Sequence, residues 1–250
     1  MTLAACAALV EKGDPDRFLA VMAAPPAARA KLFPLYAFNL EVARAAWVTE
    51  QPLIAEMRLQ FWHDVVDADT ARAHEVAGPL HEVIKETSLD ANVLHRMIGA
   101  RLWDIARGPH ASQAALDAYI EDSAAGLMWA GGQALGAPTS AETGLRALGW
   151  ASGLATYLRA VPMLKAKGRS PLRDESPGAI RALAETGLAK LALACADRNS
   201  LGPAALAAWL ARPILTQAAR SPGRVLAGSL GSSEFTRRGR LIWTATTGRF

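Results

Sequence analysis

The chain has few of the residues that build disulfide-rich or metal-dependent proteins. Its 250 residues include two cysteines, Cys6 and Cys195, which are far apart and belong to no Cys-x-x-Cys pattern. Neither a disulfide framework nor a cysteine zinc site is expected, and both cysteines are predicted to be reduced core residues. The five histidines show no His-Glu-x-x-His or similar spacing. The sequence therefore predicts no bound metal and no cofactor.

Long apolar runs are also absent. No uncharged apolar run reaches the roughly 18 residues of a membrane-spanning helix. The first residues, MTLAACAALVEKG, lack the basic start of a signal peptide and the arginines of a mitochondrial transit peptide. These observations predict a cytoplasmic protein.

Sparse β-branched residues and abundant alanine and leucine favour helices, and 51% hydrophobic residues suffice for one large core. Phe33, Tyr36, Leu40, Ala43 and Trp47 recur at steps of three and four, which predicts one face of a helix. We therefore expect a single all-α domain over residues 1–250. Helices are expected over a short segment capped by Asp14 or Asp16, then from Pro25-Pro26 to about Thr49, from Pro52 to about Asp69, and over 78–87, 90–107, 112–135, 141–161, 178–199, 203–219 and 233–247.

The net charge of +4 is unevenly distributed, because arginines crowd the C-terminal forty residues. A solvated helix face is the favoured interpretation, and a patch for an acidic partner or an anionic membrane surface is the alternative. Leu241, Ile242 and Trp243 among these cations are typical of an interfacial helix. Nucleic acid is not expected as a partner, since no zinc finger, helix-turn-helix signature or aromatic stacking motif accompanies the arginines.

Several short motifs occur in an order that resembles a known enzyme family. They are Asp16-Arg17-Phe18, Tyr36-Ala37-Phe38-Asn39, Leu59-Gln60-Phe61-Trp62, Ala77-Gly78-Pro79-Leu80, Tyr119 with Ala124-Ala125-Gly126, and the stretch 149–173. Over residues 14–215 this order resembles the squalene/phytoene synthases. The resemblance implies an isoprenoid synthase fold, which is a helical bundle with a central cavity.

Members of that family ionise an allylic diphosphate, and magnesium held by aspartates on two helices neutralises the leaving group. The resemblance places those metal-motif positions on apolar or cationic residues in this chain. They are Ala43, Arg44 and Trp47 in the first motif and Ala160, Met163 and Leu164 in the second. Such side chains cannot hold magnesium, so the resemblance predicts a pseudoenzyme with no catalytic residues and no metal.

Acidic residues elsewhere leave one alternative open. Asp64 and Asp67 could share a helix face, and an isoprenoid transferase that uses farnesyl or geranylgeranyl diphosphate with altered metal ligands could depend on them. A solvated helix end is the favoured interpretation. Asp104 is expected to pair with Arg101 or another nearby base.

Four retained positions match residues that line the cavity or face the diphosphate in the active family, namely Phe18, Tyr36, Tyr119 and Arg159. Structural packing is the default interpretation of each. Acting together, they could hold a prenyl chain, a quinone tail or another lipid without turnover.

Ala37-Phe38-Asn39-x-Glu41 and Leu158-Arg159-Ala160-x-Pro162 narrow the resemblance. They resemble the divergent, non-catalytic branch that includes assembly factor 6 of respiratory complex I, the NADH:ubiquinone oxidoreductase. This resemblance implies complex I subunits as partners and peripheral attachment at the inner membrane.

Overall fold

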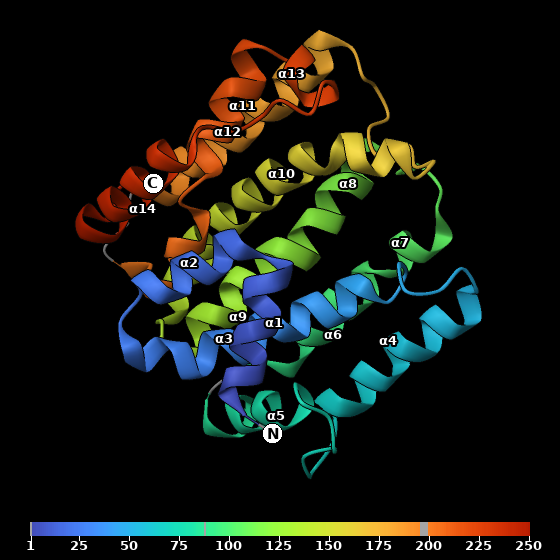
Figure 1. The fold of residues 1–250 in the computed structure, drawn as a ribbon, viewed down its shortest axis with the longest axis vertical. Coiled ribbons are helices and arrows are strands. Elements are labelled where there is room, and N and C mark those ends of the chain that lie inside the picture. Colours follow the sequence, from blue (N-terminus) through green and yellow to red (C-terminus); the bar gives the residue numbers. More distant parts are fainter. Residues whose placement is uncertain (1, 88, 196–199) are drawn as a thin grey trace.

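The computed structural model describes residues 2–87, 89–195 and 200–250, and these residues form helices and connecting segments without a β-strand (Figure 1). The predicted all-α class is confirmed. The helices are α1 (Leu3–Gly13), α2 (Pro15–Ala23), α3 (Pro26–Arg44), α4 (Pro52–Val66), α5 (Ala77–Glu86), α6 (Ala91–Ala100), α7 (Leu102–Ala106), α8 (Gln113–Ile120), the π-helix η1 (Glu121–Ala125), α9 (Gly126–Ala134), η2 (Thr139–Ala141), α10 (Glu142–Ala166), α11 (Pro177–Ala194), η4 (Pro203–Ala208), α12 (Ala211–Arg220), α13 (Gly223–Leu226) and α14 (Glu234–Thr247).

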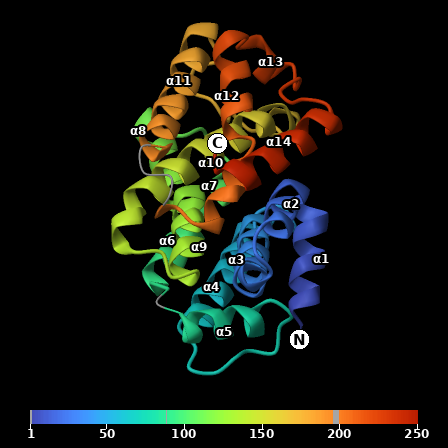
Figure 2. The same cartoon turned by 90° about the vertical axis from the view of Figure 1, so that its left-hand side faces the viewer.

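Helix α10 crosses the middle of the molecule and organises the bundle (Figure 1). It packs against η1 and α9 and also against α11 and α12, while α3 packs against α1, α2 and α9. The C-terminal helix α14 lies beside α2, as both Figure 1 and Figure 2 show. The second and the last helices of the chain therefore meet on one side of the bundle.

Two glycines allow α10 to approach η1 and α9 closely. A Cβ added at Gly149 would lie 2.6 Å from the Cβ of Met128 and 2.8 Å from the Cα of Ala125. A Cβ at Gly153 would collide with the Cβ of Ala124. The absence of side chains at these two positions thus lets the backbones of the two segments touch.

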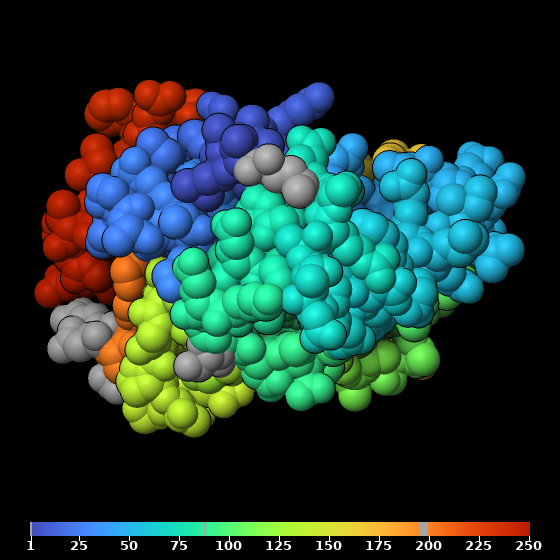
Figure 3. Space-filling view, turned by 90° about the horizontal axis from the view of Figure 1, so that it is seen from below, coloured from blue at the N-terminus to red at the C-terminus, as the bar shows by residue number. Residues whose placement is uncertain are grey.

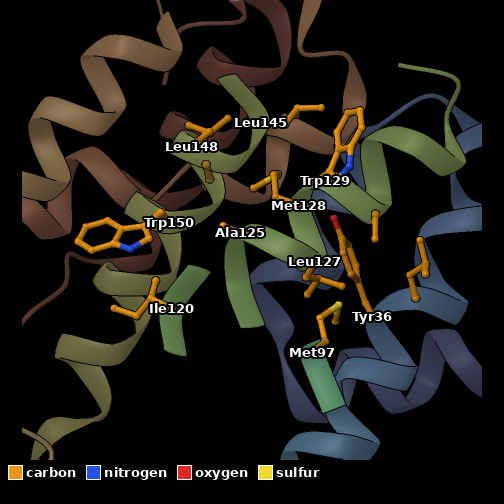
Figure 4. Packing of buried hydrophobic residues seen from close by; sticks show 14 of the residues in the cluster. Tyr36, Met97, Ile120, Ala125, Leu127, Met128, Trp129, Leu145, Leu148 and Trp150 are labelled. Atoms are coloured by element: carbon orange, nitrogen blue, oxygen red, sulfur yellow. The ribbon is translucent and has the colours of Figure 1, made fainter. Parts of the chain in front are cut away.

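The buried hydrophobic residues form one core cluster. Figure 4 shows Leu127 and Met128 of α9 between Tyr36 of α3 and Leu148 of α10. Trp150 on α10 is 2% exposed, and its indole N–H donates to the carbonyl oxygen of Asp117. This satisfied polar group explains how α10 can bury a tryptophan.

Several predicted helix boundaries differ from the structure. The helix predicted to end near Thr49 ends at Arg44, and the helix predicted over 90–107 is two helices that meet at Arg101. The helix predicted over 112–135 contains the π-helical turn η1 where it packs on α10. Residues 203–208, predicted as α-helix, are a 3-10 helix. Of the helix predicted over 178–199, residues 196–199 lie outside the described residues.

The first helix, α1, was not expected from the sequence. Thr2 caps it by accepting a hydrogen bond from the backbone N–H of Ala5, and Cys6 and Val10 bury one side of it against α3. Asp14 caps the next helix, α2, as predicted. The prediction of two core cysteines is correct for Cys6, whereas Cys195 is only half-buried; both are free thiols.

Candidate functional site

A cavity of about 400 Å³ opens between α3, α10 and the segment from α7 to α9. We call it the central cavity, and its volume lies within the range of small-molecule sites. Its described lining residues are Gly13, Asp14, Arg17, Asn39, Leu40, Ala43, Trp47, Arg101, Trp103, Asp104, Tyr119, Ile120, Ser123, Ala124, Leu127, Gly153, Thr156, Tyr157, Ala160, Met163 and Leu164.

Five of the six positions assigned to the lost metal motifs line the central cavity. Ala43 and Trp47 belong to the end of α3 and the turn after it, and Ala160, Met163 and Leu164 belong to α10. Two helices thus present these positions to one space, which is the arrangement that a metal cluster would require. The side chains there are apolar, so we call this surface the apolar wall.

The sixth position, Arg44, is not among the cavity-lining residues; its guanidinium pairs with Glu41 at 3.1 Å. Trp47 carries two cations on its ring. The Lys167 Nζ atom is 4.6 Å and the Arg169 Cζ atom is 4.8 Å from the ring centroid of Trp47. An indole flanked by cations replaces an acid there, which makes the surroundings unfavourable for a metal ion.

The described lining residues include two carboxylates, and both are paired. Asp14 forms an ion pair with Arg17 at 3.0 Å, and Asp104 forms one with Arg101 at 3.5 Å. Magnesium requires hard oxygen ligands in near-octahedral geometry. Within residues 2–87, 89–195 and 200–250, no group of three or more His, Cys, Asp or Glu residues could hold a metal ion. The residues present do not fit the magnesium cluster of the related enzymes.

The acids proposed as alternative ligands lie elsewhere. Asp64 accepts a hydrogen bond from Gln60 at 2.8 Å, and Asp67 lies 2.9 Å from the Nε2 atom of His95. Neither aspartate lines the central cavity. Their contacts match the solvated helix end that was the favoured interpretation.

A cluster of polar side chains forms the other end of the central cavity. Arg101 donates from Nη1 to the hydroxyl oxygen of Tyr119 at 2.7 Å and from Nη2 to Oδ1 of Asn39 at 3.2 Å. Tyr119 in turn donates to Asp104 at 3.2 Å. Asp104 is 5% exposed and lies one helical turn after Arg101, as expected for the ion pair. We call this cluster the basic end.

A second group of residues packs against the basic end. Arg169 donates from Nη2 to the carbonyl oxygen of Asp104. Trp103 stacks on His110 with ring centroids 3.9 Å apart. Tyr157 donates to the carbonyl oxygen of Pro171 at 2.7 Å, so the contact of 3.2 Å between its hydroxyl and Nε2 of His110 has the histidine as donor.

Burial dominates the titration of these groups. It raises the pKa of Asp104 even though Arg101 opposes the shift, and it raises the pKa of Tyr119 to about 12. It lowers the pKa of His110 to about 4. At neutral pH the tyrosine hydroxyl and the imidazole are therefore neutral, while the arginines remain charged.

The structure separates the four residues predicted to contact a ligand. Tyr119 lines the central cavity. Phe18 packs on Phe33 at 5.6 Å between ring centroids, and Tyr36 is 2% exposed beneath the guanidinium of Arg17. Arg159 lines an adjoining groove of about 370 Å³ and pairs there with Asp16 at 2.8 Å. Only Tyr119 among the four reaches the central cavity.

Sequence reasoning missed most of the basic end. The spacing of Arg101 and Asp104 predicts an ion pair, but no pattern indicated that it faces a cavity. Asn39 entered only as part of the motifs that carry the resemblance, and Trp103 and Arg169 carried no assignment. Residues from α3, α7 and the loop after α10 meet here through long-range packing, which the sequence alone does not encode in a readable motif.

The fold defines the class of protein first. The chain superposes on the crystal structure of a dehydrosqualene synthase in complex with ligand, with a TM-score of 0.83, over 98% of this chain and 95% of that one. The sequence identity of 15% means that this likeness concerns the all-α isoprenoid synthase fold alone.

The sequence then identifies the family. Residues 10–176 match the family model of squalene/phytoene synthase, so the chain belongs to the squalene/phytoene synthase family.

Two similar proteins within known sequences are named as assembly factors of respiratory complex I. NADH dehydrogenase (ubiquinone) complex I, assembly factor 6 homolog of Drosophila melanogaster is 33% identical over 171 residues, covering 63% of this chain and 50% of that protein. Assembly factor 6 of Homo sapiens is 27% identical over 161 residues, covering 63% of this chain and 48% of that protein. The chain thus spans about half the length of the curated relatives it matches.

None of the helices within the described residues is long and apolar enough to cross a membrane.

Proposed function

We propose that this chain is a non-catalytic member of its family whose central cavity holds a prenyl chain or another lipid without turnover. The observation that carries the proposal is the apolar wall. Ala43, Ala160 and Leu164 line the space where a diphosphate would need metal-bound carboxylates. A diphosphate leaving group would lack metal-bound carboxylates there, whereas an apolar chain would gain contacts.

We further propose that the chain acts in the assembly of respiratory complex I. The curated relatives named as complex I assembly factor 6 support this role. The alternative is an isoprenoid transferase with altered metal ligands, but no observation on Asp64 or Asp67 favours it.

Peripheral attachment to the inner membrane from the cytoplasmic side belongs to the same proposal. Helix α14 exposes Phe235, Ile242 and Trp243, with Phe235 90% exposed. Figure 3 shows this helix at the opposite end of the molecule from the start of α4. Arg237 pairs with Asp16 and Arg240 donates to the carbonyl oxygen of Trp209, so part of the arginine cluster is structural.

Membrane attachment is tested by flotation with anionic and with neutral vesicles. Binding to the anionic vesicles that falls with salt supports attachment, and loss of binding in Trp243→Gln assigns it to α14. No binding to either vesicle contradicts it.

Complementation tests the proposed role in complex I assembly. The gene is deleted in its own organism, and NADH:ubiquinone oxidoreductase activity is measured in membranes. We expect the activity to be lost and to be restored by the wild-type chain. Ala43→Phe, which fills the cavity, should not restore it, whereas Ala30→Phe should, because Ala30 lies on the same helix but is exposed. Unchanged complex I activity in the deletion strain would contradict the role.

A further inference from the structure

We infer that the central cavity selects amphiphiles with one apolar chain and one singly charged anionic headgroup, such as a long-chain carboxylate, bound directly by Arg101 and Arg169. This inference rests on the proposed function, which requires only that an apolar chain occupy the cavity. It adds the chemistry of the headgroup and assigns it to the basic end.

The first argument is an excess of hydrogen-bond donors. Arg101 and Arg169 carry five N–H groups each. Their acceptors in the structure are Asn39, Tyr119 and the carboxylate and carbonyl oxygens of Asp104. Among the described residues, the buried side-chain atoms without a partner include the Nε atom of Arg101, the Nη1 atom of Arg169 and the indole nitrogen of Trp103. Each unpaired donor costs free energy that an incoming oxygen acceptor would recover.

The second argument is charge. The two arginines that line the cavity, Arg17 and Arg101, are each balanced by a carboxylate, Asp14 and Asp104. Arg169 is 7% exposed, and no carboxylate oxygen of the described residues forms an ion pair with its guanidinium within 4.0 Å. Its guanidinium lies between two lining residues, since it stacks on Trp47 and donates to the carbonyl oxygen of Asp104. Among the buried charges one positive charge is therefore left over, since Lys167, the other cation beside Trp47, is exposed to solvent. One negative charge on a ligand would balance the buried one.

The third argument is the path for the chain. Leu40, Ile120 and Leu127 line the cavity together with Met163 and Leu164, so apolar side chains continue from the basic end. Met163 is 48% exposed, which places the opening of the cavity on its side. A headgroup held by Arg101 would leave its chain against these residues and its far end toward solvent.

Binding of matched 12-carbon amphiphiles tests the inference on the full chain. Laurate, dodecanol and dodecylamine carry one chain and differ in headgroup charge, and acetate carries the headgroup alone. Affinities are measured by titration calorimetry below the critical micelle concentration. We expect laurate to bind on the order of tenfold more tightly than dodecanol, with dodecylamine weaker still and acetate not detected. Equal affinity for laurate and dodecanol, or tighter binding of dodecylamine, would overturn the inference.

Variants assign the selectivity to residues. Arg101→Met should weaken laurate binding on the order of tenfold and dodecanol binding by much less, while Arg44→Met, outside the cavity, should change neither. Asp104→Asn removes the competing carboxylate and should tighten laurate binding. If Arg101→Met fails to fold, two measurements still test the inference. They are the comparison of laurate with dodecanol on the wild-type chain and the laurate affinity of Asp104→Asn.

The pattern of results separates the two proposals. If dodecanol binds as tightly as laurate, the proposal of a lipid-binding cavity stands and the proposed selectivity for an anionic headgroup is wrong. Binding of neither compound contradicts both the inference and the proposed occupancy of the cavity.

Discussion

The apolar wall and the basic end of the central cavity differ in how their side chains are satisfied. Ala43, Ala160 and Leu164 require no partner, so the wall that they form tolerates an empty or an apolar cavity. Arg101, Asp104 and Tyr119 depend on one another through hydrogen bonds and an ion pair at low solvent exposure. Losing one member of the basic end therefore leaves a buried polar group, while altering the wall mainly changes what it can bind.

This difference separates the positions assigned to the family's metal motifs from the charged residues of the cavity. Metal-dependent ionisation needs charge on the two facing helices, and that is where this chain is apolar. The charge that remains is carried by arginines on other elements, and it suits direct contact with an anion. Under the proposed function, the cavity would bind an apolar chain without the metal ligands of the enzymes.

The largest expected effect tests the interdependence of the basic end. Arg101→Met leaves Asp104 buried without its ion-pair partner, and we expect the free energy of unfolding to fall by about 4 kcal/mol. Urea denaturation at pH 7 measures this loss. The matched control, Arg44→Met, removes an exposed ion pair and should cost less than about 0.5 kcal/mol. Similar small losses in both variants would show that the basic end is not interdependent.

The wall can be tested by restoring an acid at one of its positions. Leu164 is 7% exposed, so Leu164→Asp should lower the free energy of unfolding by about 3 kcal/mol through burial of a carboxyl group. Met163→Asp on the same turn should cost less than about 1 kcal/mol, because Met163 is 48% exposed. Equal losses in thermal or urea unfolding would contradict the assigned burial.

The dependence of stability on pH tests the burial of His110, which stacks on Trp103 beside the basic end. The pKa of His110 is lowered by burial to about 4 in the folded chain, from 6.5. Between these values the unfolded chain binds the proton and the folded chain does not, so stability falls as the pH is lowered. From pH 7 to pH 5 this contribution should be about 2 kcal/mol. His110→Gln should flatten that part of the profile, and an unchanged profile would remove His110 as its cause.

The smallest effect concerns a contact outside the central cavity. Arg159 pairs with Asp16 across the adjoining groove, and its side chain is 38% exposed. Arg159→Gln should therefore lower the free energy of unfolding by no more than about 0.5 kcal/mol and leave laurate binding unchanged. A loss of binding in this variant would mean that the ligand extends into the groove.

The sequence predicted the parts of this protein that depend on local pattern. The stripe from Phe33 to Trp47 predicted one face of a helix, and α3 contains the part of it up to Ala43. The positions of the apolar wall on α3 and α10 followed from the resemblance to the family. Helix interruptions at Arg101 and at η1 were not predicted, because they arise where α7 packs against α4 and α6 and where η1 packs against α6 and α10. The basic end was missed for the same reason, since its members come from separate elements.

The claim on which the account depends is that the facing helices can no longer neutralise a diphosphate. The direct test is to incubate the purified chain with farnesyl or geranylgeranyl diphosphate and magnesium and to measure released pyrophosphate. We predict no release above a heat-inactivated control, with or without EDTA. Release that requires magnesium and disappears with EDTA would contradict the account.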